Sequence, residues 1–284
     1  MPALNDATTE LKAQPVIRSF GITDSGRVRE SNEDQFLIAE LTKTMRIRQT
    51  SLSEPMAQRG EEQGHVFLVA DGMGGHAAGE RASALAVAAV EQFTLNRLKW
   101  FFHPDGQDAK RILADFQTAL RHADTRLIEE QAQHPELKGM GTTLTMAYQL
   151  DWMLCVLHVG DSRAYVYRDG ELHQLTQDHT VTADLVRAGH LRPEEAAQHR
   201  LRKVITNVVG GDQAGIQVEA QALELQPGDR ILLCSDGLTE MVSNDEIAAT
   251  LEAHDDPELA CRVLVTRANE AGGRDNITII IAAV

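Results

Sequence analysis

Several acidic residues of the sequence stand where an apolar, strand-like run ends. Asp71, Asp161 and Asp236 each follow such a run and precede a glycine or a serine. Asp275 comes just before another apolar run, and the pair Glu33-Asp34 precedes a further one. Buried strands end at the edge of a sheet, so these side chains can converge, and gathered carboxylates repel one another unless cations bind between them. The pattern therefore predicts a site for hard divalent cations.

Length and composition limit the classes of protein that fit. The chain has 284 residues, enough for one large domain or two small ones, and 43% of them are apolar. The formal net charge of −15 argues against a general nucleic-acid binder and against binding to anionic membranes. The first residues lack a signal-peptide pattern, and no apolar stretch reaches membrane-spanning length. We therefore expect a soluble, cytoplasmic protein.

The three cysteines, Cys155, Cys234 and Cys261, show no CxxC pairing, and the first two lie inside apolar runs. We expect buried thiols in a reducing compartment. None of them lies in a loop that could cradle a phosphate, so cysteine-based catalysis is not expected.

Periodicity predicts strands, two helices, more strands, two helices and a last strand. The expected strands are 16–23, 35–41, 65–70, 141–149, 152–159, 164–168, 216–225, 230–235 and 276–283, and the expected helices are 76–100, 108–133, 244–253 and 257–271. Asp169-Gly170 has the composition of a hairpin turn. The order lacks the alternation of a doubly wound parallel sheet, and nearly continuous apolar strands indicate sheets covered on both faces. A sandwich of two sheets with helices outside satisfies both observations.

Three segments depart from this pattern. Residues 1–15 are polar and aperiodic, which indicates a flexible tail and leaves 16–284 as a single domain. Residues 42–64 are polar and charged, as expected of an extended hairpin or a surface insertion. Residues 178–213 carry mixed charge and little strand pattern.

The loop Asp71-Gly72-Met73-Gly74-Gly75-His76 allows three interpretations. A dinucleotide-binding loop needs glycine at its first, third and sixth positions, but the sixth counted from Gly72 is Ala77. Asp71 would also place a negative charge beside the pyrophosphate. Alternatively, Asp71 bridges two metals, and Gly72 lets a backbone carbonyl approach a cation. The third interpretation is an ordinary turn between a strand and a helix.

Arg29 stands shortly before the paired acids Glu33 and Asp34. Its planar guanidinium can match two phosphate oxygens at once. Beside a carboxylate-bound metal pair it would bind a phosphate that the cations attract. A solvated, charged turn is the alternative interpretation of this segment.

Taken together and in order, the motifs are a more specific signal of a protein family than any one of them alone. They occur in the order Arg29, Asn32-Glu33-Asp34, Asp71-Gly72-Met73-Gly74-Gly75, Gly141-Thr142-Thr143, Val159-Gly160-Asp161-Ser162-Arg163, Leu175-Thr176-Gln177-Asp178-His179, Ser235-Asp236-Gly237-Leu238 and Arg274-Asp275-Asn276. The series closely resembles the metal-dependent protein serine/threonine phosphatases of the protein phosphatase 2C (PPM) family, in their bacterial form. The resemblance runs from about residue 16 to the end of the sequence.

The resemblance implies an α+β fold of four layers, α-β-β-α, with a central antiparallel β-sandwich flanked by helix pairs. It also implies a pair of Mn²⁺ or Mg²⁺ ions at one end of the sandwich. Carried over by position, Asp71 would bridge both ions. Asp236 and Asp275 would complete the coordination of one ion, while the Gly72 carbonyl and waters would hold the other.

Further roles follow from the same resemblance. Glu33 and Asp34 would act close by, largely through metal-bound water, and Arg29 would bind the substrate phosphate. Asp161 would be the extra ligand that, together with Asp236, holds the third metal of the bacterial members. Residues 178–213 would form the mobile flap beside the cleft.

The implied reaction is hydrolysis of phosphoserine and phosphothreonine by a metal-activated water, without a covalent phosphoenzyme. Eukaryotic relatives carry a histidine two residues after the bridging aspartate, proposed as the general acid, where this chain has Met73. Protonation of the leaving group is therefore unassigned. His76 is one candidate acid, and a metal-bound water, which we favour, is the other.

The expected partners are phosphoserine and phosphothreonine proteins, including a serine/threonine kinase that the enzyme would oppose, or the substrates of that kinase. We expect a monomer that binds neither nucleic acid nor membranes. Two rival hypotheses stay open: a catalytically dead relative that binds phosphoproteins, and a dinucleotide-dependent oxidoreductase. The complete acidic set argues against the first, because decayed sites usually lose ligands.

Overall fold

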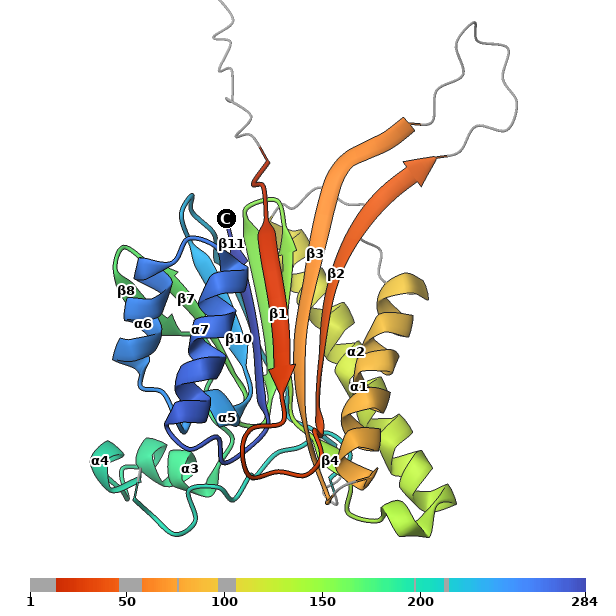
Figure 1. Cartoon of the computed structure of the whole chain (residues 1–284). Coiled ribbons are helices and arrows are strands. Elements are labelled where there is room, and N and C mark those ends of the chain that lie inside the picture. Colours follow the sequence, from red (N-terminus) through yellow and green to blue (C-terminus); the bar gives the residue numbers. More distant parts are fainter. Residues whose placement is uncertain (1–13, 46–57, 76, 97–105, 197, 212–214) are drawn as a thin grey trace, which may run out of the picture.

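Figure 1 shows the fold of the chain in a computed structural model. The structure describes residues 14–45, 58–75, 77–96, 106–196, 198–211 and 215–284. Nearly all of the predicted tail 1–15, the middle of segment 42–64 and the candidate acid His76 lie outside these residues.

Two antiparallel sheets form the centre of the molecule (Figure 1). The first has the strand order β1 (Arg18–Asp24), β11 (Ile277–Ala283), β10 (Arg230–Cys234), β7 (Arg163–Arg168) and β8 (Glu171–Gln174). The second has the order β2 (Asp34–Met45), β3 (Gln58–Met73), β5 (Leu144–Leu150), β6 (Met153–Val159) and β9 (Glu219–Glu224), and the short β4 (Gly141–Thr142) pairs with the end of β3. Strands that follow one another in the sequence mostly pair as hairpins. By contrast, β1, β10 and β11 are neighbours in the sheet although long segments separate them in the sequence.

Helices cover the outer face of each sheet (Figure 1). Helices α1 (Ala77–Asn96) and α2 (Gly106–Gln133) lie on the second sheet, and α6 (Asn244–Ala253) and α7 (Pro257–Glu270) lie on the first. The predicted four-layer α-β-β-α sandwich is therefore confirmed. Within the described residues, no helix combines the length and the apolar character needed to span a bilayer.

Three apolar layers hold these sheets and helices together. Phe67, Val156 and Ile280 belong to the layer between the two sheets, and all three are buried. Phe116 packs against Tyr148 beneath α1 and α2, with ring centroids 5.2 Å apart. A third layer lies beneath α6 and α7. Both sheets are thus covered on two faces, which explains why their strands are nearly continuous apolar runs.

Local signals account for the positions of several turns and helix ends. Asp169 and Gly170 both have positive φ, 52° and 86°, which is the geometry of the tight hairpin predicted between β7 and β8. Ser243 and Glu246 form a reciprocal capping box at the start of α6. Helix α7 begins with an Asp256 cap followed by Pro257.

The structure adds elements that periodicity did not predict. These are β8, the 3₁₀ turn Pro135–Leu137, and the short helices α3 (Val181–Arg187), α4 (Pro193–Ala196) and α5 (Asp236–Thr239). Such elements are too short to show a helical or strand period. The described parts of segment 42–64 continue β2 and β3, which project beyond the other strands (Figure 1).

The layer between the sheets makes a stability prediction. Replacing Phe67 by alanine should lower the free energy of unfolding by about 3–5 kcal/mol, because Phe67 is fully buried and its removal leaves a cavity. Leu95 is 69% exposed on α1, so Leu95→Ala should change that energy by no more than about 0.5 kcal/mol. Urea denaturation of both variants measures the difference, and equal losses would contradict this account of the core.

Candidate functional site

The acidic residues converge because the strands that carry them end on one side of the sandwich. Asp34 opens β2 and lies opposite Asp71, near the end of β3. Asp236 follows β10 and Asp275 precedes β11, and these two strands are neighbours. Asp161 follows β6 in the other sheet. Residues far apart in the sequence thus meet at the end where β4 and α5 lie, the lower end in Figure 1.

A cavity of about 270 Å³ lies at this end. Its lining residues are Arg29, Glu33, Asp71, Gly72, Met73, Gly74, Gly75, Asp161, Lys203, Ile205, Asp236, Asp275 and Asn276. Every predicted site residue that the structure describes is in this cleft, except Asp34. That residue is only 2% exposed and lies behind the cleft wall.

The carboxyl group of Asp34 is held on one side only. Its Oδ2 accepts a hydrogen bond from Ser235 Oγ (2.8 Å), and the same hydroxyl oxygen accepts one from the backbone N–H of Thr278 (3.0 Å). Among the described residues, the buried Oδ1 of Asp34 accepts no hydrogen bond. Buried polar atoms normally have partners, so a bound water molecule suits this oxygen.

The cleft carboxylates perturb one another strongly. Burial, followed by repulsion from Asp34, Asp236 and other neighbours, holds the pKa of Asp71 well above its usual range. Burial is also the first cause of the raised pKa values of Asp34, Asp161 and Asp236, which are about 7, about 8 and about 6. Such crowding disfavours the charged forms, and bound divalent cations would reverse the effect. An all-oxygen donor set of this kind fits Mg²⁺ or Mn²⁺.

Arg29 sits on one rim of the cleft. Its Nη2 donates to Asp275 Oδ2 over 2.7 Å, and this bond is the main reason that the pKa of Arg29 is raised. The side chain is still 52% exposed, so its other N–H groups face solvent and can meet a phosphate. Asp24 stabilises the turn before Arg29, because its carboxylate accepts a hydrogen bond from the Gly26 N–H.

Asn276 ties the Arg29 loop to β11, a role that the sequence did not reveal. Its Oδ1 accepts from the backbone N–H of Glu33 (2.9 Å), and its Nδ2 donates to the carbonyls of Ser25 and Ser31. This one amide fixes both ends of the loop. It therefore sets the position of Glu33 relative to Asp275.

Neutral donors also fix the Asp71 segment. The Asp71 N–H donates to Thr143 Oγ1 (3.0 Å), and Thr142 Oγ1 donates to the Asp71 carbonyl (2.9 Å). Gly72 is needed here for packing, because a Cβ at this position would lie 2.2 Å from the Gly79 carbonyl oxygen. The sequence-based explanation, that glycine clears a path for a cation, thus misses the main steric reason.

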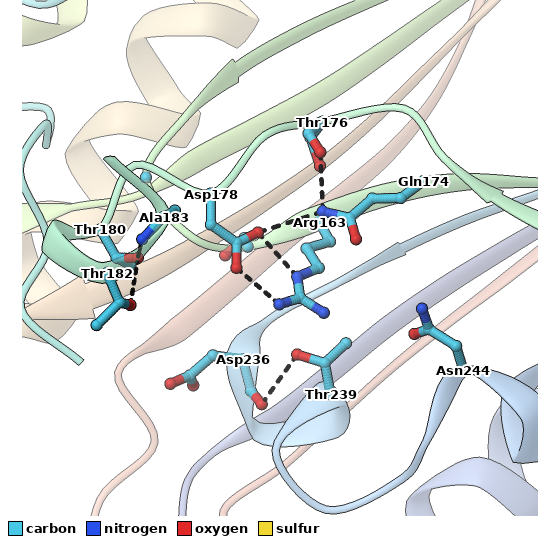
Figure 2. Close-up of polar contacts among 12 residues, drawn as sticks. Arg163, Gln174, Thr176, Asp178, Thr180, Thr182, Ala183, Asp236, Thr239 and Asn244 are labelled. Atoms are coloured by element: carbon cyan, nitrogen blue, oxygen red, sulfur yellow. Dashed lines mark hydrogen bonds and ion pairs between the residues drawn. The ribbon is translucent and has the colours of Figure 1, made fainter. Parts of the chain in front are cut away.

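A second cavity of about 440 Å³ adjoins the cleft and shares Asp161, Lys203 and Asp236 with it. Arg163 stands in its wall and binds Asp178 through two hydrogen bonds, of 2.8 and 2.6 Å. Figure 2 shows this guanidinium lying between Asp178 and the turn that carries Asp236 and Thr239. The pair anchors the start of segment 178–213 to β7.

A compact histidine cluster near this wall is better explained as a hydrogen-bond network than as a metal site. Potential ligand atoms of His158, His179 and Glu219 lie within 4.8 Å of one another. However, His158 Nε2 faces the Gly160 carbonyl and its Nδ1 faces the Thr145 hydroxyl, so both nitrogens are engaged. Burial lowers the pKa of His158 to about 3, which keeps the ring neutral.

His179 has a similar structural role. Its Nδ1 lies within hydrogen-bond distance of two donors, the Gly160 N–H (3.0 Å) and Asn207 Nδ2 (3.1 Å), which requires the ring proton to be on Nε2. His179 lines neither cavity. The ring instead links the turn before Asp161 to segment 178–213.

The cysteine predictions agree with the structure. Cys155, Cys234 and Cys261 are buried free thiols, and burial raises the pKa of each to about 12. None of the three is a nucleophile at neutral pH.

The dinucleotide-binding hypothesis is not supported. That fold requires parallel strands, whereas β3 pairs antiparallel with both of its neighbours in the second sheet. The loop after β3 opens onto a cleft lined by carboxylates, which would repel a pyrophosphate.

Comparisons with known proteins agree with this geometry. The serine/threonine protein phosphatase PstP of Mycobacterium tuberculosis is 35% identical over 95% of this chain, although the match spans only 45% of that protein's length. The serine/threonine phosphatase stp of Listeria monocytogenes is 30% identical over 91% of this chain and 92% of its own. A crystal structure of the PstP catalytic domain with two manganese ions superposes with a TM-score of 0.71, at 33% identity, covering 94% of this chain and 97% of that one.

The family model for protein phosphatase 2C matches residues 47–264, which is most of the chain. Together with the sandwich, the acidic cleft at its end and the full-length Listeria relative, this match establishes that the chain belongs to the protein phosphatase 2C family.

Proposed function

We propose that the chain is a metal-dependent phosphatase that hydrolyses phosphoserine and phosphothreonine in proteins, and that it opposes a serine/threonine kinase. The observation that supports this most is the meeting of Asp71, Asp161, Asp236 and Asp275 with Arg29 in one cleft. The likeness to named serine/threonine phosphatases supports the substrate class. We further propose that residues 16–284 act as one catalytic domain with 178–213 as its flap, and that the chain works as a cytoplasmic monomer.

The carboxylates would hold two Mn²⁺ or Mg²⁺ ions. In this proposal Asp71 would serve both ions, Asp236 and Asp275 would serve one, and the Gly72 carbonyl would serve the other. Glu33 and Asp34 would act through ordered water, and Asp161 with Asp236 would hold a third ion. When bound, these cations supply Lewis acidity and activate a water molecule for attack on phosphorus. The orphaned Asp34 Oδ1 and the raised pKa values of the cleft aspartates support such an arrangement.

The protein's own residues orient the substrate and stabilise its charge. Arg29 is preorganised by Asp275, so its remaining N–H groups can bind the equatorial phosphate oxygens without much loss of side-chain entropy. Carboxylates that repel one another also repel a phosphate. Substrate binding should therefore depend on prior neutralisation of the cleft.

The residue at the position of the eukaryotic histidine cannot protonate the leaving serine or threonine oxygen. Met73, which follows Gly72 in the cleft wall, has no proton to give. We therefore propose that a water molecule of the metal site protonates the leaving group, with His76 as the alternative.

The first prediction concerns turnover. The chelated protein should release no phosphate from a phosphothreonine peptide, Mn²⁺ should restore release, and Asp236→Asn should reduce it at least about a thousandfold. Malachite-green detection of phosphate, with far-UV circular dichroism as a folding control, measures this. Tight peptide binding without turnover in Mn²⁺ would instead favour the catalytically dead relative, and cofactor binding would favour the oxidoreductase.

The second prediction separates binding from chemistry at Arg29. Arg29→Ala should raise KM for the peptide about tenfold or more while lowering kcat less, because the guanidinium meets the phosphate before and during reaction. Arg27→Ala is the matched control, since Arg27 is exposed in the same loop and does not line the cleft. If the two variants had equal KM values, Arg29 would have no phosphate-binding role.

The third prediction follows from the raised pKa of Asp161, about 8 against an ordinary 3.8. A carboxyl group whose pKa is higher in the folded state binds protons more tightly there, so the metal-free fold loses stability as the pH rises from about 4 to about 8. Asp161→Asn removes this titration. In EDTA the Tm of Asp161→Asn should therefore increasingly exceed that of the wild type across this window.

Differential scanning fluorimetry from pH 5 to pH 8 would test this prediction. At pH 8, Mn²⁺ should raise the wild-type Tm, because cations that bind only the folded state stabilise it by mass action. A variant less stable than the wild type at pH 8 in EDTA would show that Asp161 is not under electrostatic strain.

A further inference from the structure

A lysine from segment 178–213 reaches the acidic cleft. Lys203 lies after α4, and its Nζ is 2.6 Å from Glu240 Oε2 and 3.7 Å from Asp236 Oδ2. Its side chain is 43% exposed, whereas both acids are only 19% exposed. One flexible ammonium group is thus shared between a proposed metal ligand and an acid with no proposed role in metal binding.

Lys203 occupies the junction of the two cavities. It lines the cleft that holds Arg29 and Asp71, and it also lines the adjoining cavity beneath α3 and α4. Asp161 and Asp236 are the acids that line both cavities as well. The ammonium group therefore stands at the end of the cleft to which a third cation, between Asp161 and Asp236, is assigned.

The position of the Lys203 ammonium group affects the charge balance at Asp236. Lys203 is 43% exposed and lies within ion-pair distance of two carboxylates, so its ammonium group is charged. Lys203 therefore already provides part of the positive charge that Asp236 requires.

We propose, on the basis of the function proposed above, that Lys203 is an intramolecular competitor for the cation held by Asp161 and Asp236. A divalent ion bound to Asp236 would share this carboxylate with the Lys203 ammonium group, whose Nζ lies 3.7 Å from Asp236 Oδ2, and two cations held by one carboxylate repel each other. Glu240 offers the ammonium a second partner. Binding of the ion then shifts Lys203 fully to Glu240, and the lysine lowers the affinity of this site most, because the ions of the pair have Asp71 and Asp275 as further ligands.

The test is Mn²⁺ titration calorimetry of the chelated protein. Lys203→Met should tighten the weakest Mn²⁺-binding event about tenfold, or reveal it where the wild type shows none, and should change the tighter events by less than that. Lys203→Arg keeps the charge and should stay within about threefold of the wild type. Lys110→Met removes the same charge from an exposed position on α2 and should change nothing.

Glu240→Gln should change the affinity of the weak Mn²⁺-binding event in the opposite direction to Lys203→Met. Without Glu240, Asp236 becomes the main partner of Lys203, so the weak Mn²⁺ event should weaken or vanish. A purely structural role would move the Lys203→Met and Glu240→Gln variants in the same direction, because both lose the same ion pair.

The results separate this inference from the proposed function. If Lys203→Met and the wild type have equal weak-site affinities, or if Lys203→Arg tightens binding as much as Lys203→Met, the competition is refuted while Mn²⁺-dependent phosphate release still stands. If the wild-type protein binds no Mn²⁺ at all, the proposed function fails and the inference fails with it.

Discussion

The mutual repulsion of carboxylates at one end of the sandwich is the constraint on which the rest of the site depends. The apolar layers are compatible with many sequences, but the gathering of Asp34, Asp71, Asp161 and Asp236 opposes folding unless positive charge is supplied. The protein tolerates this cost because strands pinned by large buried layers cannot separate to relieve it. Strain of this kind is typical of functional sites, where stability is given up for binding.

The surroundings of the acids keep their charge available. Ser235, Thr143 and Asn276 position the acidic segments through neutral hydrogen bonds, and Arg163 is committed to Asp178. Of the cations that line the main cleft, Arg29 and Lys203 both lie at its rim and keep about half of their side-chain surface exposed. Neutral support holds the geometry without cancelling the negative potential that attracts divalent ions. This arrangement is compatible with the roles proposed for the rim cations, on the substrate and on metal affinity.

Segment 178–213 and Asp161 behave as one structural unit. The Gly160 backbone pairs with the His179 ring and with the His179 N–H, while Arg163 holds Asp178 just ahead of it. A shift of this segment would therefore act on the loop that carries Asp161. Lys203 belongs to the same segment and reaches Asp236 from it.

The sequence determined the layers and the identity of the acidic residues, because apolar periodicity and aspartates at strand ends are local signals. The strands and long helices that it predicted are present, as is the hairpin at Asp169-Gly170, although β8 was missed and β3 begins earlier than predicted. It did not show that Asn276 fixes the Arg29 loop, that Gly72 packs against Gly79, or that Lys203 reaches Asp236. Each of these contacts joins residues whose spacing along the chain carries no period. Only the folded arrangement of the loops brings them together, and packing rather than local preference decides which side chains meet.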